Sequence, residues 1–126
     1  VYGHSHDVIC SSNLIIAVSG TATLEAALFK KPMIIVYKTS ALSWLIFKSM
    51  LLIPYIGLPN ILLKKFVVPE FLQKKASPEN ISKKAISILA DKKLQNELKS
   101  IFRVLHIKLK KNSSEIIYKK IIRYLK

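Results

Sequence analysis

The chain has 126 residues, 51% of them hydrophobic, and a formal net charge of +14. This length allows one domain with a real core and little more. The single cysteine, Cys10, excludes an internal disulfide and any multi-cysteine metal site, and no signal peptide is visible. The longest apolar stretch, residues 41–53, is too short to cross a bilayer, which takes about 20 residues. We expect Cys10 to be buried and the setting to be reducing and cytoplasmic.

The positive charge is concentrated in residues 64–126, which hold 17 of the 21 lysines and arginines and five of the seven acidic residues. Only Arg103 and Arg123 in this part are arginines. Nucleic-acid-binding proteins favour arginine for bidentate contacts, so we expect no nucleic-acid partner. We interpret the lysines mainly as solvent faces of helices, with attraction to an anionic membrane surface as the alternative.

An α/β unit is predicted close to the start of the chain. Residues 2–12 should form a loop and a short helix, and residues 14–18 and 33–37 are unbroken apolar runs typical of parallel strands covered on both faces. The residues between the two runs suffice for a crossover helix at about 21–30. Two parallel strands are too few for a stable open sheet, so we expect a C-terminal piece of something larger.

A second apolar helix is predicted over residues 41–53, where Trp44, Phe47 and Leu51 share one face. Such a face is either core or an exposed surface for acyl chains, a membrane or a missing domain. Residues 56–60, Ile-Gly-Leu-Pro-Asn, should then form a constrained loop.

The remainder of the chain is predicted to be helical. Ser77 followed by Pro78 is a favourable N-cap and first helical residue, and Asp91 should cap another helix. Asn112 with Glu115 three residues later resembles a capping box that would open the last helix.

The turn between the first strand and its helix is the clearest candidate site. It contains Ser19, Gly20 and Thr21, with Thr23 two residues further on. A helix N-terminus offers unpaired N–H groups, and hydroxyls beside a glycine turn can complete a phosphate site. The turn has neither the Gly-Lys-Ser/Thr of a Walker loop nor the three glycines of a dinucleotide fingerprint. A plain capped helix therefore explains it equally well.

Glu25 adds a second candidate group one turn inside the same helix. A carboxylate there is commonly just a partner of the helix dipole. Ala22 stands at the capping-box offset from it, so Glu25 is not obviously committed to capping. It could instead accept hydrogen bonds from both hydroxyls of a ribose. A turn for a diphosphate and a carboxylate for a ribose describe a nucleotide-sugar site.

Four segments together resemble the C-terminal third of the lipid-A-disaccharide synthase family. They are Ser-Gly-Thr-Ala-Thr-Leu-Glu-Ala-Ala at 19–27, Lys-Pro-Met-Ile-Ile-Val-Tyr at 31–37, Leu-Pro-Asn at 58–60 and Phe-Arg-Val-Leu-His at 102–106. The first segment occurs more widely among glycosyltransferases of the GT-B fold, whereas the last two make the resemblance specific. It covers essentially the whole chain.

The resemblance implies an α/β fold in which residues 1–126 form part of the C-terminal, UDP-sugar-binding Rossmann-like domain, a short parallel sheet followed by several helices. It implies an inverting hexosyl transfer from UDP-2,3-diacylglucosamine to 2,3-diacylglucosamine 1-phosphate in lipid A biosynthesis, with no metal or cofactor. Ser19, Gly20 and Thr21 would hold the diphosphate, Glu25 the ribose, and Asn60 would sit near the donor sugar. Such an enzyme would lie at the inner face of the inner membrane of a Gram-negative bacterium.

The chain also departs from the family, whose members are much longer. The acceptor site and the proposed general base belong to an N-terminal domain with no counterpart here, so the resemblance assigns no catalytic residue to this chain. We expect it to be inactive unless an N-terminal fragment complements it, and a homodimer is a further expected assembly because the family exchanges C-terminal segments between subunits. The alternative hypothesis is a non-catalytic basic helical module that binds anionic lipid or nucleic acid.

Overall fold

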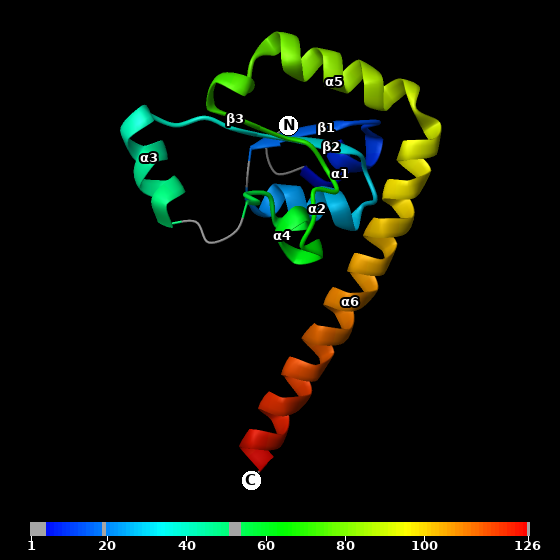
Figure 1. Ribbon diagram of the computed structural model, residues 1–126. Coiled ribbons are helices and arrows are strands. Elements are labelled where there is room, and N and C mark those ends of the chain that lie inside the picture. Colours follow the sequence, from blue (N-terminus) through cyan, green and yellow to red (C-terminus); the bar gives the residue numbers. More distant parts are fainter. Residues whose placement is uncertain (1–4, 19, 51–53, 126) are drawn as a thin grey trace.

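The computed structural model describes residues 5–18, 20–50 and 54–125, and it has the predicted α/β fold (Figure 1). Three parallel strands form one sheet in the order β1 (Ile15–Val18), β2 (Met33–Tyr37) and β3 (Glu70–Leu72). Ile15 of β1 pairs with Met33 of β2. The helices are α1 (Ser5–Ser11), α2 (Thr21–Leu28), α3 (Ala41–Met50), α4 (Leu58–Leu63), α5 (Pro78–Ala90) and α6 (Lys92–Leu125), with a 3-10 turn η1 (Gln73–Lys75) after β3.

The strand β3 was not predicted, because the whole region after residue 60 was interpreted as helical. It has three residues, Glu-Phe-Leu, which are too few to show an alternating pattern. Its extended form depends on pairing with the second half of β2, where Ile35 lies opposite Glu70. A long-range partner therefore decides the structure of this segment.

The predicted crossover between the first two strands is confirmed. Figure 1 shows α2 and α4 on one side of the sheet and α5 on the other. In α2 the fully buried side chains of Ala26 and Ala27 are small, which lets this helix approach the sheet closely. The parallel direction of β1 and β2 follows from this helical connection, since a tight hairpin would make the strands antiparallel.

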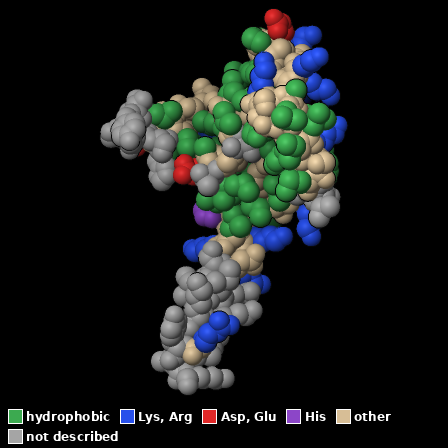
Figure 2. All heavy atoms as spheres, turned by 90° about the vertical axis from the view of Figure 1, so that its left-hand side faces the viewer, with side chains coloured by type: hydrophobic (Ala, Val, Ile, Leu, Met, Phe, Trp, Pro, Cys, Tyr) green, Lys and Arg blue, Asp and Glu red, His purple; other side chains and the backbone are tan. Residues whose placement is uncertain are grey.

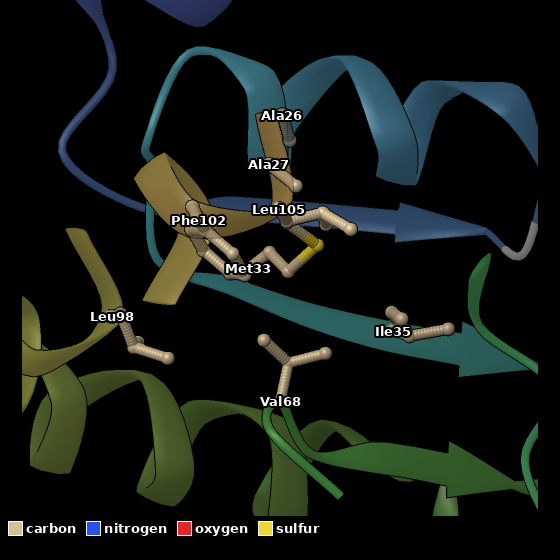
Figure 3. Packing of buried hydrophobic residues seen from close by; sticks show 8 residues of the cluster. All are labelled: Ala26, Ala27, Met33, Ile35, Val68, Leu98, Phe102 and Leu105. Carbon is tan, nitrogen blue, oxygen red and sulfur yellow. The ribbon is translucent and has the colours of Figure 1, made fainter. Parts of the chain in front are cut away.

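The main core lies where α6 packs against β2 and α2, as Figure 3 shows. Phe102 and Leu105 of α6 lie beside Met33 of β2, and Ile35 of β2 belongs to the same cluster; all four are buried. Burying a side chain such as Phe102 contributes on the order of 1.5–3 kcal/mol, so α6 is a substantial part of the domain. The Phe-Arg-Val-Leu-His segment consequently has a structural role through its two apolar residues.

The expectation that both strands are covered on both faces is right for β2 and wrong for β1. Met33, Ile34 and Ile35 of β2 are all fully buried. In β1, Ile16 is 53% and Val18 64% exposed. Alternate residues of a strand face opposite sides of the sheet, so β1 is covered only on the side of α2.

Three local predictions need correction. Residues 58–60 belong to the first turn of α4 instead of a loop, because Pro59 fits the start of a helix as well as it fits a turn. Asn112 lies inside α6, since a capping-box pattern does not by itself interrupt a continuous helix. Cys10 is exposed, on the short helix α1.

The predicted caps of two other helices are confirmed. The Ser77 hydroxyl accepts from the Asn80 N–H at 3.2 Å, and Asp91 Oδ1 accepts from the Leu94 N–H at 3.0 Å.

The helix α3 stands apart from the core. Trp44 and Phe47 are half-buried and form an aromatic cluster with Tyr37, with ring centroids 5.9–6.4 Å apart. None of the residues of α3 is fully buried, and Leu51, the third member of the predicted face, lies outside the described residues. Trp44 and Phe47 therefore pack against Tyr37 while the other described residues of α3 are exposed, and what this exposed surface binds stays a prediction. Within residues 5–18, 20–50 and 54–125, no helix has both the length and the apolar character to cross a membrane.

Candidate functional site

The turn after β1 leaves its backbone open. Gly20 is the N-cap of α2 and has φ 146° and ψ −163°, a conformation that residues with side chains rarely adopt. It is exposed, and apart from its two chain neighbours no described atom lies within 4 Å of the point where a β-carbon would stand. A ligand could therefore approach this backbone closely. Thr21 begins α2, and Ser19 lies outside the described residues.

The N-terminus of α2 is not capped by a side chain, since its N-cap is a glycine. The first N–H groups of a helix have no partner within the helix and carry a partial positive charge. An anion at the turn would meet these donors at the carboxyl end of β1. Open α/β sheets bind their ligands at this end of the strands.

Thr23 stabilises the turn from the inside. Its side chain is fully buried, and its hydroxyl donates to the Gly20 carbonyl oxygen at 2.6 Å, while its backbone N–H reaches the same oxygen at 3.2 Å. The sequence predicted this hydroxyl as part of a phosphate site. That prediction is wrong in this conformation, because the hydroxyl is turned to the Gly20 carbonyl and is shielded from solvent.

Glu25 lies one turn further along α2 and is half-buried. It stands four residues after Thr21, and residues at this spacing lie on the same side of a helix. This spacing puts Glu25 and Thr21 on the same side of α2. Its assignment to a ribose stays a prediction.

Asn60 has a different environment from the one expected of a sugar-binding residue. It is fully buried in α4. Its Nδ2 donates to the Val68 carbonyl at 2.9 Å and to a carboxylate oxygen of Glu70 at 2.7 Å, and its Oδ1 accepts from the N–H groups of Val67 at 2.7 Å and Val68 at 3.0 Å. These four bonds use the full hydrogen-bonding capacity of the amide. Asn60 therefore fixes the segment before β3, and its place near a donor sugar remains a prediction.

Glu70 is a residue whose role the sequence did not reveal. Its carboxylate accepts from the backbone N–H groups of Ile56 at 3.0 Å and Gly57 at 2.9 Å, in addition to the amide of Asn60. It thereby connects the start of β3 to the segment before α4. Hydrogen bonds to a charged group are among the stronger ones in proteins. The sequence could not indicate this role of Glu70, because the segment before α4 and the start of β3 come together only in the folded chain.

Gln73 plays a similar part at the carboxyl end of β2. It has a positive φ of 55°, and its side-chain amide forms two hydrogen bonds with the backbone of Thr39. The Thr39 N–H donates to Oε1 at 2.8 Å, and Nε2 donates to the Thr39 carbonyl at 2.9 Å. The chain leaving β2 is thus fixed beside β3. It lies at the carboxyl-terminal end of the parallel strands, where the turn with Gly20 also lies.

The described residues contain no group of three histidine, cysteine, aspartate or glutamate side chains that could hold a metal ion. His106 instead lies beside Lys30, with its Nδ1 2.8 Å from the lysine Nζ. This contact joins α6 to the end of α2, which is a structural use of the last residue in the Phe-Arg-Val-Leu-His segment.

Comparison with known proteins decides the family. A model of the lipid-A-disaccharide synthetase family matches residues 1–122. The chain belongs to this family. A lipid-A-disaccharide synthase of Methylobacillus flagellatus is 41% identical over 126 residues, and one of Cupriavidus pinatubonensis is 43% identical over 116 residues. These alignments cover 100% and 92% of the chain but only 33% and 29% of the relatives, so the chain spans about a third of the length of the curated relatives it matches.

Proposed function

We propose that this chain supplies the donor site of a lipid-A-disaccharide synthase, a hexosyltransferase that uses UDP-2,3-diacylglucosamine and 2,3-diacylglucosamine 1-phosphate. Its relatives carry that name, and the family match extends over nearly the whole chain. The observation that carries the proposal is the open glycine turn at the carboxyl end of β1, where Gly20 is exposed and the position of a β-carbon would be unobstructed.

The turn would bind the diphosphate of the donor. The backbone N–H groups at the start of α2, together with Ser19 and Thr21, would donate to phosphate oxygens, and Glu25 would accept from the ribose hydroxyls. Donors already aimed at the leaving diphosphate stabilise the charge that develops as the sugar is transferred. Asn60 would act indirectly, because it fixes the segment that leads into β3.

The other half of the chemistry needs a base that activates the acceptor hydroxyl. We assign that base to the part of the relatives that this chain does not span. The chain alone would then bind the donor without transferring the sugar, and activity would require a complementing N-terminal part. A homodimer is a further proposed assembly, which would not by itself supply the missing base.

We further propose a cytoplasmic protein held at a membrane surface, since its substrates would be acylated. The exposed apolar side chains of α3 and the exposed lysines of α5 support this placement. The inner face of the inner membrane of a Gram-negative bacterium is the corresponding location.

Titration with UDP tests the donor site. We expect Glu25→Gln to weaken UDP binding about tenfold or more, since a hydrogen bond to a charged group is worth ~1.5–3 kcal/mol. Glu79→Gln, an exposed residue in the first turn of α5, is the matched control and should leave the affinity unchanged. Equal affinities of the Glu25→Gln and parent chains, with and without a relative's N-terminal part, would refute the ribose assignment.

The basic half of the chain favours one other function, binding to anionic polymers or lipids. Its test is the salt dependence of binding to a polyanion such as heparin. A steep salt dependence that neither UDP nor Glu25→Gln affects, in a chain that fails to bind UDP, would favour the basic helical module over the donor site.

A further inference from the structure

A cavity of about 730 Å³ lies between α3 and the segment formed by β3 and η1. Its volume falls in the range of ~300–1,000 Å³ that is typical of small-molecule sites. The larger apolar side chains of its wall are Trp44 and Leu45 from α3, Phe66 from the segment before β3, and Leu72 at the end of β3, with Ala41 and Pro54 beside them. It shares no residue with the turn at Gly20 or with Glu25.

The surface around this cavity is strongly apolar. Leu45 is 64% and Phe66 62% exposed. Figure 2 looks at the molecule from the α3 side and shows apolar side chains gathered there, with basic side chains above and beside them. Exposed apolar surface that lines a cavity is a common mark of a ligand site.

The charged residues of the cavity are mostly positive. Lys48 of α3 and Lys74 and Lys75 of η1 line it, and all three are exposed. Glu70 is its acidic member, but the carboxylate of Glu70 already accepts hydrogen bonds from two backbone N–H groups and from Asn60. The exposed charges that line the cavity are therefore cationic.

We infer that this cavity binds an anionic amphiphile, with the alkyl chain against Trp44, Leu45, Phe66 and Leu72 and the anionic head at Lys74 and Lys75. An apolar wall beside lysines suits such a molecule better than a nucleotide, which would need polar partners for its base and ribose. The site is separate from the proposed donor site, so each can fail without the other.

Trp44 provides a direct readout, because it is the single tryptophan of the sequence and it lines the cavity. The full chain is titrated with decyl, undecyl and dodecyl phosphate below their micelle concentrations while tryptophan fluorescence is recorded. We expect saturable binding that becomes about fourfold tighter for each added methylene, which is ~0.8 kcal/mol converted at 1.4 kcal/mol per tenfold. A signal that does not saturate, or affinities independent of chain length, would overturn the inference.

Two leucines of α3 form a matched pair of variants. Leu45 lines the cavity, whereas Leu42 is 70% exposed and does not line it. We expect Leu45→Asn to weaken dodecyl phosphate binding at least fivefold and Leu42→Asn to leave it unchanged. Equal losses in both variants would show adsorption to the general apolar surface of α3 and would refute a cavity site. Circular dichroism checks that both variants fold, as expected for exposed positions.

The head-group contact has its own variants. Lys75→Gln should weaken binding about two- to fivefold at low salt, as expected for an exposed charge pair, with less effect at high salt. Lys93→Gln removes an exposed lysine of α6 outside the cavity and should have no effect. Dodecyl phosphate binding should be the same in Glu25→Gln as in the parent chain, because Glu25 is not a lining residue. Loss of binding in Lys93→Gln equal to that in Lys75→Gln would reduce the contact to net charge and refute the assigned head-group position.

Discussion

Gly20 and Gly57 both lie in short connections beside the sheet, yet they are glycines for opposite reasons. Gly20 needs its left-handed φ of 146°, and a β-carbon there would have no described neighbour within 4 Å beyond the adjacent residues. Gly57 has an ordinary φ of −72°, but an added β-carbon would overlap the Cδ1 of the buried Ile35 and lie 3.2 Å from Glu70 Oε2. The described part of the first connection is exposed to solvent, and the second connection is filled by the protein itself.

The difference extends to the polar groups of the two connections. Beside Gly57, the side chains of Asn60 and Glu70 together form six hydrogen-bonding contacts with their surroundings, one of them shared between the two. Beside Gly20, the described side-chain bond is the one from Thr23 to the Gly20 carbonyl. A glycine motif followed by a polar residue can thus be a binding site or a packed joint, and only the three-dimensional contacts separate the two cases.

The largest effect is expected from Asn60→Ala. The change would leave the N–H groups of Val67 and Val68 and the Val68 carbonyl without their partner, and each buried unpaired group costs ~1–3 kcal/mol. We expect the free energy of unfolding to fall by about 3 kcal/mol or more, measured by urea denaturation. Asn96→Ala, at an exposed position of α6, is the control and should change it little. A loss of UDP affinity with full stability would instead place Asn60 at the donor sugar.

Gly57→Ala should have the next largest effect. Forcing a methyl group into a packed site costs ~1–3 kcal/mol, here because it meets Ile35. Shortening that neighbour tests the cause directly: in an Ile35→Val background, which lacks the overlapping Cδ1, the same glycine change should cost clearly less. Additive losses in the double mutant, measured by denaturation, would mean that Ile35 is not what excludes a side chain at position 57.

The sequence predicted the parts of the fold that short-range patterns determine. Residues 33–37 are five apolar residues in a row, and they form a strand with three fully buried members. Ser77 and Asp91 cap helices as expected, because a cap acts within three residues. The turn at Gly20 was found in the same way, from a strand, a glycine and a helix in succession.

The remaining features depend on partners distant in the sequence. The strand β3 exists through its pairing with β2, and Gln73 finds Thr39 across 34 residues. The resemblance implied a place for Asn60 near the donor sugar, but in the structure its amide satisfies four backbone and side-chain groups of the chain itself. Residue type was therefore informative about chemistry but not about which partner would use it.

Thr23→Val should have the smallest effect on the free energy of unfolding, and it bears most directly on the difference between the connections at Gly20 and Gly57. It removes the hydroxyl that donates to the Gly20 carbonyl, and a typical hydrogen bond contributes ~1 kcal/mol, so the free energy of unfolding should fall by about that amount. Thr23→Ser keeps the hydroxyl and should retain the bond. UDP affinity should fall a few-fold in the valine variant only, since the hydroxyl helps to hold the backbone that would meet the diphosphate. Thr23→Val should cost far less than Asn60→Ala only if the turn at Gly20 is less tightly packed than the connection at Gly57. Equal losses of unfolding free energy in the two variants would contradict this difference between the two connections.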